Sequence, residues 1–304
     1  MNDPSDLKSS RTDLCPVLIP DHLDDAHPLV IVIGGSSGGL RSVDQAEYYR
    51  DQGYPAAVIP YFGMEGLPAE LKLIPLEHFR DCVAHIAAHP ALRGRQVYLQ
   101  GTSKGAEACL LLCSKELVDV DGVILMSPSR YVWGASADIE DLTAGRVTEQ
   151  SCWSWENEPV DFVRFDPANP LPPVINNIEG TDCFVFKETW YPRIKGGVGL
   201  IDLSNWTTPL LIFSGQDDDL WPSDRAAREI QETISHQGQA DLVRHVSFPD
   251  VGHQIPFPGK TPNLVLAHPQ LGYAISYGGQ HQATVNAASV WWRETREFLN
   301  NAEP

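Results

Sequence analysis

The stretch "VYLQGTSKGAEACLLLC", residues 97–113, places a serine between two glycines where a strand-like run becomes a helix-like one. Gly101, Ser103 and Gly105 form the pattern G-x-S-x-G. In a nucleophile elbow the residues two before and two after the serine must be small, because strand and helix approach each other closely. The pattern therefore predicts that Ser103 is a nucleophile at the carboxyl edge of a sheet, the alternative being a simple strand-to-helix turn.

Strand-like and helix-like segments alternate on both sides of this stretch. The predicted strands cover 29–34, 55–60, 96–101, 121–127, 208–215 and 242–249, and the predicted helices cover 42–53, 74–90, 104–117, 223–236 and 284–299. Strands that alternate with helices at these lengths indicate parallel pairing with right-handed crossovers. The predicted fold class is α/β, with a mostly parallel central sheet flanked by helices.

The alternation stops between residues 130 and 206. This segment holds five of the eight tryptophans and the proline-rich run "DPANPLPP" (166–173), without a sustained period. Such an excursion between two sheet strands predicts an aromatic-rich lid over a pocket, the alternative being an insertion with its own small core. We expect Trp133, Trp153, Trp155 and Trp190 to bind an apolar or aromatic group. The expected domain organisation is an N-terminal extension (1–28) and one α/β domain (29–304) that carries the lid.

Charge limits the possible partners. The 304 residues include 40 acidic and 22 basic side chains, for a net charge of -18. The field of such a chain repels nucleic acid and anionic membranes, so neither is an expected partner. The first residues lack the pattern of a targeting segment, and no apolar run reaches the length of a membrane span. We expect a cytoplasmic protein that acts on a small molecule without a metal or another cofactor.

A serine nucleophile needs a base and an acid, and both occur later in the chain. His253 in "FPDVGHQIP" follows the last predicted strand, whereas His245 lies inside that strand and is expected to be structural. The acid should follow the strand 208–215, where "GQDDDLW" offers three aspartates. Asp218 is the favoured acid, with Asp219 and Asp217 as alternatives.

The order Ser, Asp, His along the chain is that of the α/β-hydrolases. An oxyanion hole is expected from the glycine-rich run "GGSSGG" (34–39), through backbone N–H groups near Ser36 and Ser37, together with the N–H of Lys104. The alternative for the glycine run is a tight strand-to-helix turn.

Five segments give the chain a more specific resemblance: "GGSSGGL" (34–40), "GYPAAVIPYFGMEGLPAELKLIPLEHF" (53–79), "GTSKGAE" (101–107), "GQDDDLWPS" (215–223) and "FPDVGHQIPFP" (248–258). In these segments the chain resembles the C-terminal domain of the acyl-CoA thioesterases and bile acid-CoA:amino acid N-acyltransferases. The resemblance implies that Ser103, Asp218 and His253 are nucleophile, acid and base, and that an acyl group passes from a thioester through an acyl-enzyme. Mammalian members carry an additional N-terminal β-sandwich domain, whereas 28 residues precede the first predicted strand in the sequence here.

The predicted reaction is hydrolysis of an acyl thioester, such as an acyl-CoA, or of an ester. Within the family, serine at the nucleophile favours water as acceptor, whereas the N-acyltransferases tend to use cysteine. Transfer of the acyl group to an amine or alcohol is the first alternative, and a non-catalytic binding protein of the same fold is the second. A CoA substrate would need basic side chains at the pocket, with Lys104, Arg130 and Arg193 as candidates.

Overall fold

A seven-stranded sheet runs through the centre of the computed structural model, which describes residues 11–24, 26–135, 150–164, 173–178, 180–194, 196–268 and 273–301. Its order is β1-β3-β2-β5-β6-β11-β12, and only β1 runs antiparallel to its neighbour. The strands are β1 (Val17–Leu18), β2 (Leu29–Ile33), β3 (Ala56–Val58), β5 (Val97–Thr102), β6 (Gly122–Met126), β11 (Leu210–Gly215) and β12 (Val243–Phe248). The predicted α/β class with a mostly parallel sheet is confirmed.

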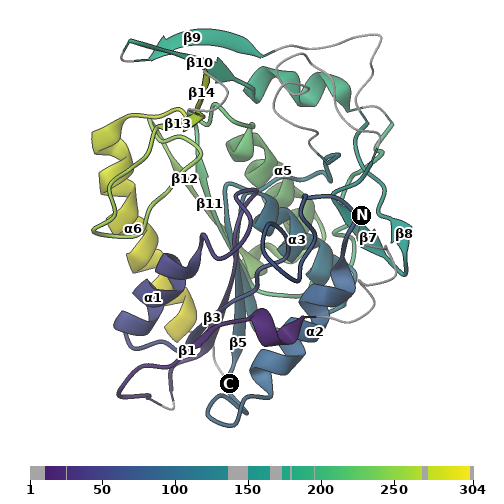
Figure 1. The fold of residues 1–304 in the computed structure, drawn as a ribbon, viewed down its shortest axis with the longest axis vertical. Helices are drawn as coiled ribbons and strands as arrows, with labels where there is room; N and C mark the ends of the chain where they lie inside the picture. Colours follow the sequence, from purple (N-terminus) through teal and green to yellow (C-terminus); the bar gives the residue numbers. More distant parts are fainter. Residues whose placement is uncertain are drawn as a thin grey trace.

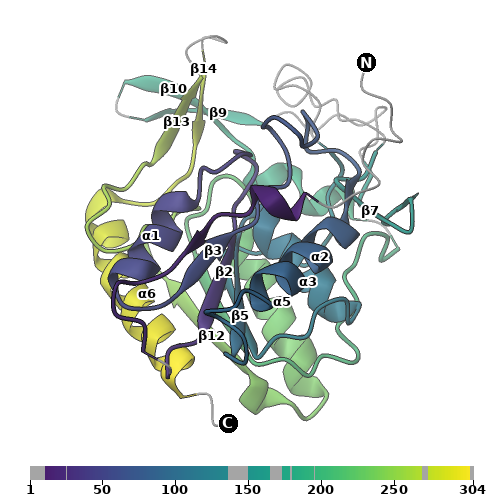
Figure 2. The same ribbon diagram turned by 60° about the horizontal axis from the view of Figure 1, so that its bottom comes forward.

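Helices cover both faces of this sheet, because its strands are apolar on both sides (Figures 1 and 2). Along β2, Leu29, Ile31 and Ile33 face one core, and Val30 and Val32 face the other. The first core also takes side chains from α2, α3 and α5, and the second takes them from α1 and α6. The helices are α1 (Val43–Asp51), α2 (Leu76–Ala87), α3 (Lys104–Ser114), α5 (Ser223–His236) and α6 (His281–Asn300), with short 3-10 turns at Thr12–Leu14, Lys187–Thr189, Tyr191–Arg193 and Ala240–Leu242.

Two small sheets lie outside the central one, in regions where the sequence predicts no strand; β4 takes the first two residues of the predicted helix 74–90, and the helix α2 begins only at Leu76. One has the order β4-β7-β8, and the other has the order β13-β14-β10-β9. Their strands are β4 (Ile74–Pro75), β7 (Trp153–Trp155), β8 (Glu158–Pro159), β9 (Val174–Ile178), β10 (Thr181–Val185), β13 (Val265–His268) and β14 (Tyr273–Ser276). Strands of two to five residues are too short to show a sequence period, and several pair with segments far away in the chain. The segments 136–149 and 165–172 of the expected lid lie outside the described residues.

The second small sheet joins two separate parts of the chain. β9 and β10 belong to the segment between β6 and β11, whereas β13 and β14 follow β12. They meet through parallel pairing of β10 with β14, where Cys183 lies opposite Ala274 and Phe184 opposite Ile275. Figure 1 shows this sheet at the end of the molecule to which the main-sheet strands β11 and β12 point.

The central sheet starts earlier in the chain than the sequence predicts. Val17 and Leu18, within the expected N-terminal extension, pair antiparallel with Ala57 and Ala56 of β3 and form the edge strand β1. Two residues carry no detectable alternation, so this strand has no signal in the sequence. None of the helices in the described parts of the chain combines the length and the apolar character needed to cross a membrane.

Candidate active site

Ser103 occupies a strained turn between β5 and α3. Its φ of 57° and ψ of -118° form a backbone conformation that residues with a side chain rarely adopt. A Cβ added to Gly101 would lie 2.4 Å from the backbone oxygen of Gly105, and one added to Gly105 would lie 2.1 Å from that of Ile33. No side chain fits at either position, so both glycines allow α3 to cross closely over the strands. The local structure is that of a nucleophile elbow.

Asp218 and His253 form a buried hydrogen-bonded pair. Asp218 Oδ2 lies 2.8 Å from His253 Nδ1, and the two residues are 2% and 4% exposed. The same carboxylate accepts hydrogen bonds from the N–H groups of Leu220 and Trp221 at 2.9 and 3.1 Å, and from the hydroxyl of Ser223 at 2.6 Å. These donors suit a negatively charged carboxylate, and they fix the direction in which it meets the imidazole.

The two neighbouring aspartates point elsewhere. Asp219 accepts a hydrogen bond from Ser276 Oγ at 2.7 Å and forms an ion pair with Lys187 at 2.9 Å. The side chain of Asp217 is exposed. Of the three aspartates that the sequence leaves open, Asp218 is the one whose carboxylate contacts His253.

A second grouping of Ser, His and Asp lies outside this site. Ser214 Oγ on β11 lies 2.7 Å from His245 Nε2 on β12 and donates a hydrogen bond to Asp224 on α5 at 2.9 Å. Ser214 is fully buried, so no substrate reaches its hydroxyl. Burial lowers the pKa of His245, although the carboxylate of Asp224 opposes that shift. This network ties α5 to two central strands, in agreement with the structural role expected for His245.

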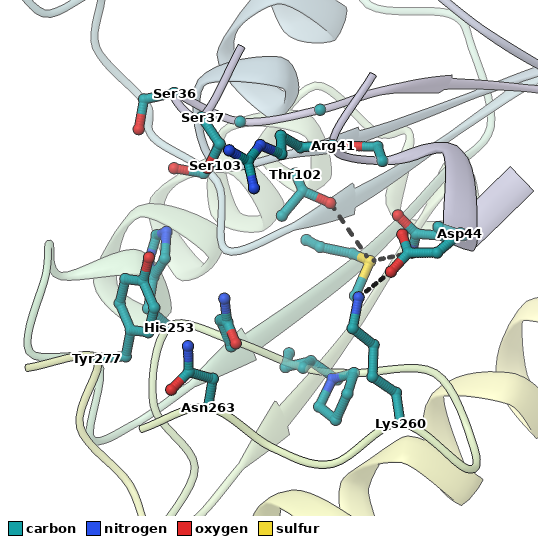
Figure 3. Close-up of a pocket in the computed structure, with 18 of the residues that line it drawn as sticks. Ser36, Ser37, Arg41, Asp44, Thr102, Ser103, His253, Lys260, Asn263 and Tyr277 are labelled. Atoms are coloured by element: carbon teal, nitrogen blue, oxygen red, sulfur yellow. Dashed lines mark hydrogen bonds and ion pairs between the residues drawn. The ribbon is translucent and has the colours of Figure 1, made fainter. Parts of the chain in front are cut away.

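Ser103 and His253 line a common cavity of about 340 Å³ (Figure 3). Its lining includes the glycine-rich run 34–39 on one side and residues 253–257 on the other. Apolar contacts within it come from Met126, Leu220 and Phe257, among others. Across the described residues, no group of histidine, cysteine, aspartate and glutamate side chains could hold a metal ion.

The glycine-rich run passes directly over Ser103. A Cβ on Gly35 would lie 3.2 Å from Ser103 Cβ, and the Tyr61 hydroxyl bonds the backbone oxygens of Gly34 and Gly35, each at 2.8 Å. Ser36 and Ser37 both line the cavity. No group in the described chain accepts a hydrogen bond from the N–H of Ser36, Ser37 or Lys104. These three N–H groups are therefore free to bind a ligand oxygen.

The side chain of Lys104 turns away from the cavity. Its ammonium lies 3.0 and 3.2 Å from the two carboxylate oxygens of Glu107 and 3.3 Å from the backbone oxygen of Trp133. Glu107 is fully buried and also accepts the indole N–H of Trp153 at 2.7 Å. Burial lowers the pKa of Lys104, but nearby Cys152 and Glu107 outweigh it and the net shift is upward. Burial also raises the pKa of Glu107, against the attraction of Lys104.

The four tryptophans expected to bind substrate lie outside the lining of this cavity. Trp133 and Trp153 are almost completely buried, and both contact Glu107. Trp155 lies under the guanidinium of Arg80, and the indole N–H of Trp190 donates to a backbone oxygen at 2.6 Å. Trp133 also packs against Trp190, and Trp153 packs against Tyr61 and Phe79. A role in binding substrate stays a prediction, and this cavity gives it no support.

Two basic residues that the sequence did not single out line the cavity instead of the expected ones. They are Arg41, just after the glycine-rich run, and Lys260, which forms an ion pair with Asp44 at the start of α1. Figure 3 shows Lys260 and Asp44 at the opposite side of the view from Ser36 and Ser37. The candidates Arg130 and Arg193 are not part of the lining. Arg41 and Lys260 carried no signal in the sequence, because they lie in loops far apart in the chain.

Comparison with known proteins places this chain in a family. The family model "BAAT / Acyl-CoA thioester hydrolase C terminal" matches residues 74–303, which is more than half of the chain. Acyl-coenzyme A thioesterase 6 of Homo sapiens is 26% identical over 275 residues, covering 90% of this chain and 59% of that protein. Acyl-coenzyme A thioesterase 3 of Mus musculus is 24% identical over 275 residues, covering 90% and 58%. The chain thus spans about three fifths of the length of these curated relatives.

Solved structures agree on the fold. An α/β hydrolase, MGS-M1, from a Medee basin deep-sea metagenome library superposes with a TM-score of 0.52 at 15% identity, covering 95% of this chain and 92% of that one. The monoacylglycerol lipase of Paleococcus ferrophilus gives a TM-score of 0.52 at 15% identity, with coverages of 95% and 98%. The α/β-hydrolase fold and the family match agree, and the chain belongs to the BAAT/acyl-CoA thioester hydrolase C-terminal family.

Proposed function

We propose that the protein hydrolyses acyl thioesters through an acyl-enzyme formed on Ser103. The observation that carries the proposal is the buried hydrogen bond of 2.8 Å between Asp218 and His253, in a site where His253 and the strained Ser103 line one cavity. A carboxylate only accepts hydrogen bonds, so the hydrogen of the neutral imidazole sits on Nδ1. The lone pair of Nε2 is then available to take a proton.

The proposed reaction has two halves. Ser103 Oγ attacks the acyl carbon while His253 takes its proton, and the imidazolium then protonates the sulfur as the thiol leaves. Water next attacks the acyl-enzyme, gives its proton to His253 and releases the acid, and the proton returns to Ser103. In both halves the charge on the acyl oxygen is held by N–H groups near Ser36 and Ser37 and by the N–H of Lys104.

The leaving group that the cavity suits best carries phosphate, as coenzyme A does. Arg41 and Lys260 bring two positive charges to the cavity of a chain whose net charge is -18. Within the described residues Arg41 forms no ion pair, and the ion-pair partner of Lys260 is Asp44. Phosphate oxygens are strong acceptors for both side chains. The names of the relatives, acyl-coenzyme A thioesterases, point to the same leaving group.

The serine mechanism is tested by intact mass spectrometry after exposure to a fluorophosphonate, with wild type and Ser103→Ala side by side. We expect one phosphonyl adduct on wild type and none on the variant. Hydrolysis is then followed with a panel of acyl-CoA thioesters and simple esters, with and without glycine as an acyl acceptor. Free acid as the product supports hydrolysis, and acylglycine would favour transfer. An unlabelled wild type would refute the nucleophile and leave a binding protein of the same fold.

The leaving group is tested with matched substrates and variants. Arg41→Ala and Lys260→Ala should each raise KM about 3- to 10-fold for an acyl-CoA, because each removes one partly exposed phosphate contact. Neither should change KM for the N-acetylcysteamine thioester of the same acid, which carries no phosphate. Lys115→Ala, which removes an exposed cation outside the cavity, is the control. Equal effects on both substrates would contradict a phosphate contact.

A further inference from the structure

Tyr277 lines the cavity beside His253 and has no assigned role. It directly follows β14, and Figure 3 shows it next to His253, on the same side of the cavity as Asn263. The two rings stack with centroids 5.8 Å apart at an angle of 28°. This side chain therefore forms one wall of the space in front of the imidazole.

The backbone of Tyr277 is held tightly in place. Its carbonyl oxygen accepts the N–H of His253 at 2.7 Å and that of Asp219 at 3.3 Å. The next residue, Gly278, has a φ of 76°, and a Cβ there would lie 1.8 Å from the backbone oxygen of Asp217. The segment after β14 thus contacts both the loop of Asp218 and the loop of His253. The backbone from which the Tyr277 side chain extends is therefore fixed relative to these two loops.

The hydroxyl of Tyr277 is left without a partner. The residue is 8% exposed. Among the described residues neither a side chain nor a backbone group hydrogen-bonds this hydroxyl, which lies at the cavity that Tyr277 lines. Burial raises the pKa of the phenol, so it stays protonated around neutral pH. A neutral phenol can both donate a hydrogen bond and accept one. An unpartnered hydroxyl on a tyrosine that lines a cavity is a binding group for a small polar molecule there.

We propose that Tyr277 is a further catalytic residue, whose hydroxyl orients the water that hydrolyses the acyl-enzyme. The water donates one hydrogen to the Tyr277 oxygen and the other to His253 Nε2. As the water oxygen bonds to the acyl carbon, His253 takes the second proton and returns it to Ser103 Oγ when the bond from serine to the acyl group breaks. Tyr277 itself neither gains nor loses a proton.

This role rests on the proposed function and adds a reason why water is the acceptor. An acyl-enzyme partitions between water and other nucleophiles according to how well each is positioned. Tyr277 positions a molecule that can donate two hydrogens at once, and water does so while an oxygen lone pair still faces the acyl carbon. An alcohol has only one hydrogen to donate, so the hydroxyl favours hydrolysis over transfer to an alcohol.

The test is Tyr277→Phe, which keeps the ring against His253 and removes only the hydroxyl. We expect kcat for a thioester to fall about 10- to 100-fold, in line with the loss of one hydrogen bond in the transition state. Because only the second half-reaction is slowed, acyl-enzyme should accumulate in the intact mass spectrum. The rate of fluorophosphonate labelling, which does not need the water, should stay within about 3-fold of wild type. Added hydroxylamine, which attacks the acyl-enzyme directly, should restore turnover.

Tyr98→Phe is the matched control, because Tyr98 is also a buried tyrosine of the same domain but lies outside the cavity. It should hydrolyse the thioester like wild type. The proposal is overturned if Tyr277→Phe hydrolyses at the wild-type rate, or if labelling and turnover fall in parallel without accumulation of acyl-enzyme, which would indicate a purely structural ring. Failure of the proposed function is recognised separately, because wild type itself would then not be labelled.

Discussion

The buried ion pair between Lys104 and Glu107 supports a prediction that the structure makes quantitative. The changes are Lys104→Met and Glu107→Gln, made singly and together. In the wild type the ammonium lies 3.0 Å from one carboxylate oxygen, and the other oxygen accepts N–H groups of Trp153 and Trp133 at 2.7 and 3.3 Å. A glutamine oxygen in the same place can keep both tryptophan contacts, while its NH2 group replaces the oxygen that faced the ammonium, so that Glu107→Gln removes the charge and one acceptor of Lys104.

The magnitude follows from the cost of leaving one charge unpaired. A buried group can escape that cost by becoming neutral, which at pH 7 takes about 1.36 kcal/mol for each unit between the pH and its ordinary pKa. With ordinary values of about 10.4 for lysine and about 4.3 for glutamate, the upper limits are ~4.6 kcal/mol for Glu107→Gln and ~3.7 kcal/mol for Lys104→Met. The double variant leaves no charge behind and should lie within about 1.5 kcal/mol of wild type.

The assay is urea unfolding followed by tryptophan fluorescence at several pH values. In Lys104→Met the lone carboxyl has a folded pKa above its unfolded one, so its penalty grows as pH rises above about 4.3. In Glu107→Gln the lone ammonium has a folded pKa below its unfolded one, so its penalty shrinks as pH rises toward about 10. The two slopes are opposite in sign. A double variant less stable than both single variants, or two variants with parallel pH dependence, would refute the reasoning.

Three further predictions concern the elbow, the acid and the buried histidines. Gly105→Ala puts a Cβ 2.1 Å from a backbone oxygen of β2, so we expect a loss of more than about 3 kcal/mol in the free energy of unfolding. A variant with the thermal midpoint of wild type would contradict the need for α3 to approach β2 this closely. Asp218→Asn should slow fluorophosphonate labelling about 10³- to 10⁴-fold, whereas Asp219→Asn should slow it less than about 10-fold, and equal effects would argue against Asp218 as the acid. Burial lowers the pKa of His78 and of His245, so the unfolded chain binds more protons below about pH 6.5 and the free energy of unfolding should fall from there toward pH 5. His245→Gln should make that slope shallower by up to about 1.4 kcal/mol per pH unit, and an unchanged slope in urea titrations would show that this histidine does not contribute.

The central sheet and its helices could be predicted from the sequence because their signals are local. The strands β2, β3, β6 and β11 are mostly apolar runs, and the large helices have start or stop residues of their own. The elbow is local as well, since Gly101, Ser103 and Gly105 and the segments on both sides fall within one short stretch. Close packing of α3 on the strands is what makes those glycines necessary, so the pattern and the geometry have one cause.

The choice among three adjacent aspartates could be narrowed but not made from the sequence. What directs Asp218 toward His253 is the turn after β11, in which the N–H groups of Leu220 and Trp221 both reach one carboxylate oxygen. Such an arrangement depends on backbone angles that the letters "DDD" do not specify. The structure brings Asp218 to His253 and directs Asp219 to Ser276.

The tryptophans of the insertion show where composition misleads. Aromatic residues in a segment without a clear period can face a ligand or can form the core of the segment itself, and both give the same sequence. Here the indole groups of Trp133 and Trp153 find buried partners in Ser129 and Glu107. The sequence does not show that a carboxylate on α3 is their partner, because the contact joins residues far apart in the chain. The sequence likewise gives no sign that Arg41 and Tyr277 line the cavity, because the other lining residues lie far from them in the chain.

The pairing of β10 with β14 has a consequence for how members of this family can diverge or be recombined. The insertion between β6 and β11 is not a separate structural unit, because its strand β10 pairs with β14 of the later hairpin β13–β14. The paired residues Cys183 and Ala274 are about 91 positions apart in the chain. That hairpin ends at the residues that contact the loops of Asp218 and His253. A chimaera that exchanged only residues 130–206 would leave β14 of the host hairpin without the β10 strand that it normally pairs with. Grafting the hairpin together with the insertion would keep the pairing of β10 with β14. Mutations that alter one of these two strands should be accompanied by compensating changes in the other.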